Sequence, residues 1–127
     1  MTPNPKKILV VDDSKFARTI LVNGLKKEGF NVIEAENGQE AVEITKIEKP
    51  NLIIMDVVMP VLNGIEATKV LKNLNETNKI PILILTGQNS KEEILEGFNA
   101  GADEYLCKPF KFTELIATLK TLLNLYK

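Results

Sequence analysis

Five short apolar runs, each followed by an amphipathic stretch, do most to constrain the fold of this 127-residue chain. Continuous apolar runs are typical of parallel strands that helices cover on both faces. The expected strands are residues 8–11, 32–35, 52–55, 82–85 and 103–107. Because strands and helices alternate, the sequence predicts an α/β fold with right-handed crossovers. Length and strand count favour a doubly wound five-stranded parallel sheet, (βα)5, in the flavodoxin-like order 2-1-3-4-5.

The amphipathic stretches predict five helices. Ser14 and Ser90 are each expected to cap a helix that begins just after them. One face of the first helix is expected to consist of Ala17, Ile20, Leu21, Gly24 and Leu25, and the fourth helix is expected to carry Ile94, Leu95 and Phe98. The clearest apolar stripe lies in the last helix and consists of Phe112, Leu115, Ile116, Leu119, Leu122 and Leu123.

Composition indicates one globular domain, since 44% hydrophobic and 26% charged residues are ordinary values. We expect residues 1–6, which contain two prolines, to be a flexible N-terminal tail and residues 7–127 to be the domain. A net charge of −1 gives no reason to expect nucleic acid or an anionic membrane as a partner. No apolar run is long enough to span a membrane. The single cysteine fits a reducing, cytoplasmic location.

The chain contains no histidine, and this absence restricts its chemistry. A Ser-His-Asp triad and a His-ligated zinc site are excluded, as is a phosphohistidine on this chain. Any reaction must therefore use carboxylates, lysines or hydroxyls.

Polar residues follow four of the five predicted strands. Asp12 and Asp13 follow the first strand, Asp56 the third, Thr86 the fourth and Lys108 the fifth. In doubly wound sheets, ligands bind beyond the carboxyl ends of the strands. We therefore expect these side chains to share one site.

Three carboxylates and one lysine would give this site a charge of minus two. Two carboxylates ~4 Å apart repel by ~4 kcal/mol at an effective dielectric constant of ~20, and a divalent cation would relieve this repulsion. Carboxylate oxygens without His or Cys select a hard ion, and Mg2+ in particular shares its ligand shell with phosphate. Lys108 can then pair with an anionic ligand to which Thr86 donates a hydrogen bond. Asp56 is a candidate nucleophile, because carboxylates form acyl phosphates.

Each of these residues also has an ordinary structural interpretation. Asp12 and Asp13 could form a turn and a helix cap, which is the commoner role for Asp before a helix when no third carboxylate is nearby. Thr86 could be a loop hydroxyl that caps the next helix, and Lys108 could be a solvated lysine. Tyr105 is by default a core aromatic residue. Only the combination of these residues favours a functional site.

Five short motifs occur in order along the chain: Val10-Val11-Asp12-Asp13-Ser14, Met55-Asp56-Val57-Val58-Met59-Pro60, Asn63-Gly64, Leu85-Thr86-Gly87 and Lys108-Pro109-Phe110. Together they resemble the receiver domain of bacterial response regulators. The resemblance extends from about Lys7 to the end of the last helix. Each motif alone is weak, but the set is highly specific.

The resemblance implies a role for each acidic residue. Asp56 matches the phosphoacceptor. Asp12 and Asp13 match the acidic pair that holds Mg2+ together with Asp56, and the main-chain carbonyl of Val58 matches a further ligand. The side chain of Val58 is apolar, whereas rapidly dephosphorylating chemotaxis members carry a polar residue there. We therefore expect slow self-dephosphorylation, which Val58→Asn should accelerate.

The resemblance also implies a switch. Thr86 matches the hydroxyl that moves to the phosphoryl group, and Lys108 matches the lysine that contacts this group, usually through a cis bond to Pro109. Tyr105 matches the aromatic residue that turns inward when Thr86 moves. The surface made by the fourth helix, fifth strand and fifth helix would then change for a downstream partner.

These matches imply a domain of two-component (phosphorelay) signal transduction and not an enzyme, although it would assist its own phosphorylation and dephosphorylation. Its partners would be a sensor histidine kinase or a phosphotransfer protein, and a downstream protein target. One alternative is a Mg2+-dependent aspartyl-phosphate phosphatase of the haloacid-dehalogenase type, which needs an Asp-x-Asp pattern that Asp12-Asp13 lacks. Another is a flavodoxin-like cofactor carrier, whose phosphate loop two aspartates would disfavour. A degenerate receiver that acts only as a scaffold is disfavoured by the full acidic set.

Overall fold

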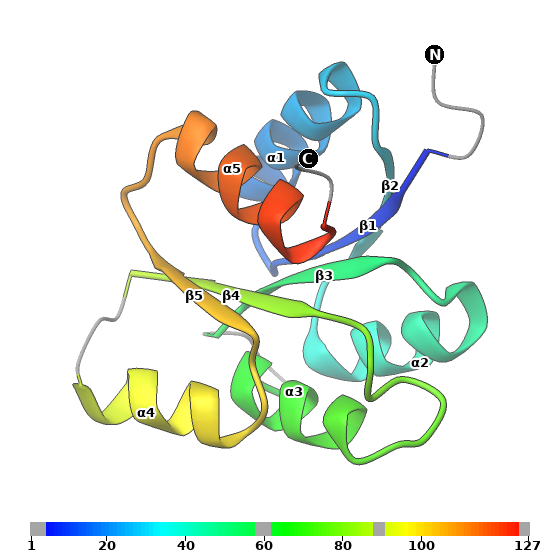
Figure 1. Ribbon diagram of the computed structural model, residues 1–127, viewed down its shortest axis with the longest axis vertical. Coiled ribbons are helices and arrows are strands. Elements are labelled where there is room, and N and C mark those ends of the chain that lie inside the picture. Colours follow the sequence, from blue (N-terminus) through cyan, green and yellow to red (C-terminus); the bar gives the residue numbers. More distant parts are fainter. Residues whose placement is uncertain (1–4, 58–61, 88–90, 125–127) are drawn as a thin grey trace.

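The computed structural model describes residues 5–57, 62–87 and 91–124. Its centre is a five-stranded parallel sheet in the order β2-β1-β3-β4-β5 (Figure 1). The strands are β1 (Lys7–Val11), β2 (Asn31–Ala35), β3 (Leu52–Asp56), β4 (Ile82–Thr86) and β5 (Glu104–Cys107). The predicted doubly wound sheet and its strand order are therefore confirmed.

In the described part of the chain, five helices alternate with the strands. They are α1 (Lys15–Lys27), α2 (Gly38–Glu48), α3 (Gly64–Lys72), α4 (Lys91–Asn99) and α5 (Phe112–Leu122). Helices α1 and α5 cover one face of the sheet, whereas α2, α3 and α4 cover the other (Figure 1). None of the helices in these ranges combines the length and the apolar character needed to cross a membrane.

The side chains of strand β1 alternate between the two faces of the sheet. Ile8 and Val10 belong to the apolar cluster with α1 and α5, whereas Leu9 and Val11 belong to the cluster with α2 and α3. All four side chains are buried. Full burial of one such side chain contributes about 1.5–3 kcal/mol. The strands that end at the predicted site are thus firmly anchored in the core.

Helix α1 packs through most of the predicted face, but Ile20 is not part of the buried stripe. Arg18 and Val22 are buried beside Leu21 and Leu25, whereas Ile20 is 55% exposed. A helix buries a stripe of limited width, and α1 has more apolar residues than that stripe holds. In this orientation of the helix, the Arg18 side chain reaches the Asp12 carbonyl at the end of β1.

Helix α4 forms and carries the expected apolar residues, but Leu95 and Phe98 are 60% and 43% exposed. Its buried residue is Gly97, where a Cβ atom would lie 3.1 Å from the Tyr105 ring. This glycine allows α4 to approach β5 closely. The prediction for α5 holds at its centre, where Leu115, Ile116 and Leu119 are buried.

The start of α1 was predicted correctly. Ser14 is its N-cap, and Ser14 Oγ accepts a hydrogen bond from the Ala17 amide at 3.2 Å. Such a cap contributes about 1 kcal/mol to stability. The other predicted cap, Ser90, lies outside the described residues.

Candidate functional site

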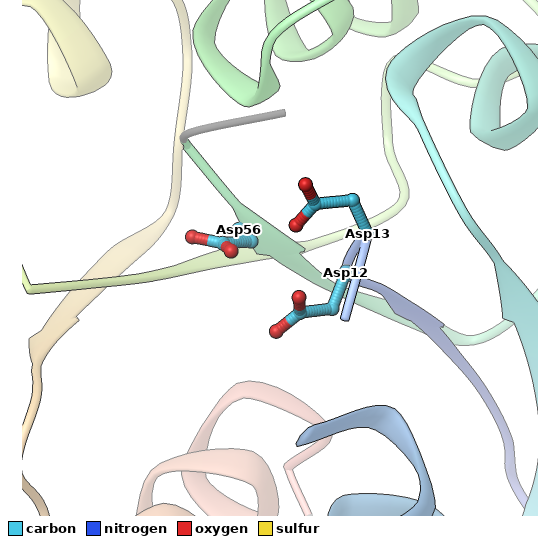
Figure 2. A group of neighbouring side chains, drawn as sticks. All are labelled: Asp12, Asp13 and Asp56. Atoms are coloured by element: carbon cyan, nitrogen blue, oxygen red, sulfur yellow. The ribbon is translucent and has the colours of Figure 1, made fainter. Parts of the chain in front are cut away.

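Three aspartates meet at the carboxyl ends of two neighbouring strands (Figure 2). Asp12 and Asp13 directly follow β1, and Asp56 is the last residue of β3. One carboxylate oxygen from each aspartate lies within 4.8 Å of those from the other two. Asp12 is buried, Asp56 is half-buried and Asp13 is exposed. The predicted acidic cluster therefore forms at the switch point of the sheet, with access from solvent at Asp13.

The loop after β1 holds Asp12 by both its backbone and its side chain. The Ser14 amide donates to Asp12 Oδ1 at 2.9 Å, and the Asp12 amide donates to the Ala35 carbonyl at 3.2 Å. The start of α1 and the end of β2 thus fix the orientation of this carboxylate. Its second oxygen, Oδ2, faces Lys108 at 3.8 Å.

Arg18 supports the same loop from inside α1. Its Nη1 donates to the Asp12 carbonyl at 2.8 Å, and its Nε donates to Glu34 Oε1 at 3.0 Å. The residue is only 7% exposed, which is rare for an arginine without a structural partner. Sequence reasoning did not identify Arg18. The available signal was its position one helical turn after Ser14, close to the acidic pair.

Lys108 follows β5, on the other side of β4 from Asp56, and its ammonium group adds a positive charge beside the aspartates. Its Nζ lies 3.8 Å from Asp12 Oδ2 and 3.9 Å from Asp56 Oδ2. The Lys108 amide donates to the Thr86 carbonyl at 2.7 Å, and the Lys108–Pro109 peptide bond is cis. The predicted combination of three carboxylates with one ammonium group is therefore present in the fold.

The start of α3 packs against the end of β3. The Gly64 amide donates to the Val57 carbonyl at 3.0 Å, and a Cβ atom on Gly64 would collide with the Asp56 carbonyl oxygen. Asn63 and Glu66 form a reciprocal capping box at the start of α3. The Asn63-Gly64 motif thus allows α3 to begin directly against the Asp56 backbone. Val58, whose carbonyl was predicted to bind the metal, lies outside the described residues.

Thr86 and Tyr105 are hydrogen-bonded through their side chains, and both also approach a residue that was not predicted, Glu93 of α4. The Tyr105 hydroxyl donates to Glu93 Oε1 at 2.9 Å, and the Thr86 hydroxyl lies 3.5 Å from the same oxygen. Thr86 is fully buried, and Tyr105 is half-buried. Burial, and then the hydrogen bond to Glu93, raise the pKa of the Tyr105 phenol above its ordinary value. Glu93 gave no sequence signal, because it stands in an ordinary run of acidic residues at a helix start.

This arrangement can bind a hard cation and a phosphoryl group together. The carboxylate oxygens suit Mg2+, and the donor set of the cluster contains neither His nor Cys. An ammonium group 3.9 Å from the Asp56 carboxylate can neutralise charge that develops on a transferred group. Metal binding, a carboxylate nucleophile and charge neutralisation are thus available in one place.

Comparison with known proteins gave consistent matches. The family described as "Response regulator receiver domain" matches residues 8–120. The chain is 42% identical over 119 residues to the alkaline phosphatase synthesis transcriptional regulatory protein PhoP of Bacillus subtilis (strain 168), covering 94% of this chain and 49% of that protein. The chain thus spans about half the length of the curated relatives it matches.

Solved structures agree with the sequence matches. A putative response regulator from Chloroflexus aurantiacus J-10-fl superposes with a TM-score of 0.91 at 34% identity, covering 95% of this chain and 99% of that one. The receiver domain of a sensor histidine kinase from Pseudomonas aeruginosa PAO1, with a magnesium ion coordinated in its active site cleft, has a TM-score of 0.89 at 29% identity. That match covers 95% of this chain and 99% of the other.

Proposed function

This chain belongs to the family of response regulator receiver domains, and we propose that Asp56 is the residue that receives its phosphoryl group. The family acts in two-component signal transduction, where phosphorylation carries the signal. Neither a haloacid-dehalogenase-type phosphatase nor a flavodoxin-like cofactor carrier is favoured, because the family match covers residues 8–120. The domain is a signalling domain, and the proposed chemistry at its acidic site is the transfer of a phosphoryl group.

The position of Asp56 supports its role as the phosphoacceptor. Its side chain is at the end of a buried strand and is 13% exposed, so the surrounding core restricts it while a part of it remains accessible to solvent. In the proposed step, a carboxylate oxygen of Asp56 forms a bond to phosphorus while the bond from phosphorus to the donor's histidine nitrogen breaks. Lys108 would stabilise the charge on the phosphoryl oxygens. Because this chain has no histidine, a sensor histidine kinase or a phosphotransfer protein would supply the phosphohistidine.

We assign Mg2+ binding to Asp12, Asp13 and Asp56. The oxygen-only donor set and its spacing within 4.8 Å fit this ion, and a magnesium-containing structural relative supports the choice. The main-chain carbonyl of Val58 is proposed as a fourth protein ligand on the resemblance alone. When bound, Mg2+ would neutralise the acidic cluster and the incoming phosphoryl oxygens. Asp12 is held in place for this role by Ser14 and Arg18.

The proposed output is a change in the surface formed by α4, β5 and α5. Thr86 would donate to the phosphoryl group, and the loop after β4 and Tyr105 would respond. The downstream partner is proposed to be a protein. The chain would assist both its own phosphorylation and its dephosphorylation, the latter slowly because the apolar Val58 side chain cannot orient a water molecule.

Intact-mass measurement tests the proposal directly. The protein is incubated with a small phosphodonor and Mg2+, with and without EDTA. We expect a base-labile phosphoryl adduct that requires Mg2+ and is absent in Asp56→Asn. Glu36→Gln, which removes an exposed carboxylate next to the end of β2, is the matched control and should still form the adduct. Absence of the adduct in the parent, or its persistence in Asp56→Asn, would disprove the role of Asp56.

A further inference from the structure

The turn after β2, residues 35–38, lies outside the acidic cluster but is hydrogen-bonded to both loops that carry the cluster. The Ala35 carbonyl accepts from the amide of Asp12, in the loop after β1, at 3.2 Å. The Gly38 amide donates to the Leu62 carbonyl at 3.0 Å. Leu62 belongs to the loop between β3 and α3, which begins directly after Asp56. The strand from whose end no site residue was predicted therefore contacts both loops through its turn.

Hydrogen bonds within the turn hold it in place. Asn37 is the N-cap of α2, and its Oδ1 accepts from the Glu40 amide at 2.8 Å. In return, Glu40 Oε1 accepts from the Glu36 amide at 3.1 Å. Reciprocal bonds of this kind fix the direction in which a chain enters a helix. The position of Gly38 is therefore set by β2 and α2, and the loop of Leu62 is placed against it.

Glycine at position 38 allows the two backbones to approach each other closely. A Cβ atom on Gly38 would collide with the Leu62 carbonyl oxygen and would lie 2.9 Å from the Leu62 carbonyl carbon. Gly38 is buried, and the Leu62 side chain packs against the apolar cluster beneath α2 and α3. The obstructing atoms thus belong to the backbone of an anchored residue and cannot rotate away. A larger residue at position 38 must displace the turn or the loop.

The contact at Leu62 affects Asp56 because the described ends of the loop are joined to each other. The Gly64 amide donates to the Val57 carbonyl at 3.0 Å, and Gly64 lies against the Asp56 carbonyl oxygen. Leu62 stands just before this junction in the chain. A displacement of Leu62 would therefore be transmitted to the backbone of Asp56.

We propose that residues 35–38 form a brace that holds the loops of Asp12 and Asp56 in a fixed relation, and that Gly38 is the positioning residue of this brace. The three aspartates offer carboxylate oxygens within 4.8 Å of one another, and the brace maintains this spacing. Its consequence for Mg2+ binding rests on the proposed function. Replacement of residues that orient metal ligands typically weakens metal binding by about 10- to 100-fold. We expect a loss of this order when a side chain is added at Gly38.

Urea unfolding at a series of Mg2+ concentrations tests the brace in the full chain. We would compare the parent, Gly38→Ala and Gln39→Ala, which changes the exposed neighbour of Gly38 in the first turn of α2. The dissociation constant for Mg2+ follows from the gain in stability over EDTA. It should rise by about 10- to 100-fold in Gly38→Ala and stay at the parent value in Gln39→Ala. A purely structural role of Gly38 would lower stability in EDTA and leave the dissociation constant unchanged.

A second pair of variants decides the question if Gly38→Ala does not fold. Leu62 and Ile65 are both half-buried and pack against the same apolar cluster, but only Leu62 is bonded to Gly38. Leu62→Ala and Ile65→Ala should therefore lose similar stability in EDTA. Only Leu62→Ala should bind Mg2+ more weakly, by about tenfold.

Amide hydrogen exchange of the metal-free protein gives a readout that does not involve Mg2+. In EDTA, the Asp12 amide or the Gly64 amide should exchange at least about fivefold faster in Gly38→Ala than in Gln39→Ala, because the added Cβ atom strains one of their two hydrogen bonds. Exchange at the Ile54 amide in the core measures global unfolding and is used to correct both rates. If Gly38→Ala does not fold, Leu62→Ala and Ile65→Ala are compared in the same way.

The brace is overturned if the corrected exchange rates of both amides are the same in the variant and its control. It is also overturned if the parent binds Mg2+ and the variant binds it equally well. If the stability of the parent does not depend on Mg2+, the assignment of Mg2+ to the three aspartates fails, and exchange alone decides for or against the brace. The two proposals can therefore fail separately.

Discussion

Lys108 Nζ lies 3.9 Å from the Asp56 carboxylate, although β4 separates β3, which ends at Asp56, from β5, which ends just before Lys108. The distance is too long for a direct hydrogen bond. The ammonium group therefore balances the charge of Asp56 and Asp12 without being fixed to either. The Lys108 ammonium group can therefore move toward a phosphoryl group on Asp56. Its contribution to the rate of phosphoryl transfer can be measured by substitution.

Lys108→Met should slow the formation of the Asp56 adduct by about a hundredfold, because removal of one preorganised charge-stabilising group has an effect of this order. The rate is measured by intact mass at fixed phosphodonor and Mg2+ concentrations. Lys26→Met removes an exposed lysine at the end of α1 and should leave the rate unchanged. Equal rates in the two variants would exclude a role for Lys108 in phosphoryl transfer.

The acidic cluster should make the protein more stable in Mg2+ than in EDTA. At a Mg2+ concentration of a hundred times the dissociation constant, the gain in the free energy of unfolding is about 2.7 kcal/mol. Asp13→Asn should abolish most of this gain while it stabilises the metal-free protein, because it removes one of three mutually repelling carboxylates. Urea unfolding of both proteins, with and without Mg2+, measures the two effects. A full Mg2+ response in Asp13→Asn would show that this residue is not a ligand.

Arg18 offers a test of how the metal loop is held. Arg18→Met removes the bond to the Asp12 carbonyl and leaves a buried acceptor unsatisfied, which should cost about 1–3 kcal/mol in the free energy of unfolding. Glu34→Gln removes only the charge of the partner of Arg18. The Glu34 side chain is 46% exposed, so this change should cost less than about 1 kcal/mol.

The same pair of variants separates support of the loop from general stability. Because Asp12 is a proposed ligand, we expect Arg18→Met to weaken Mg2+ binding and Glu34→Gln to leave it close to the parent value. Titration of the unfolding midpoint with Mg2+ gives both affinities. Parent-like Mg2+ affinity in Arg18→Met would restrict this arginine to a role in folding.

The outcome for individual residues shows how far the sequence could predict the site. Asp12, Asp13, Asp56 and Lys108 were found because each lies at or just after the end of a predicted strand, and the carboxyl ends of parallel strands meet at one edge of the sheet. Their grouping needed only the strand order. The cap at Ser14 was also predicted correctly, because capping is a local interaction that depends only on neighbouring residues.

Residues that depend on helix rotation were missed. Arg18 reaches Asp12 because α1 turns this residue, and not Ile20, toward the strand ends. Glu93 reaches Tyr105 because Gly97 allows α4 to lie close to β5. Apolar periodicity indicates that a helix is amphipathic, but it does not fix which of several possible faces packs against the sheet. Long side chains that bridge two elements are therefore visible only in the structure.

The raised pKa of Tyr105 predicts a loss of stability in alkali. The folded state favours the protonated phenol, through burial and then through the bond to Glu93, whereas the unfolded chain titrates near pH 10. This contribution is fully present below pH 10. Above that pH the unfolded state releases its proton while the folded state retains it, so the free energy of unfolding falls as the pH rises. Tyr105→Phe, compared with the parent by urea unfolding between pH 8 and 11, should lack this part of the decrease. Parallel curves for the two proteins would show that the Tyr105 phenol has the same pKa in both states.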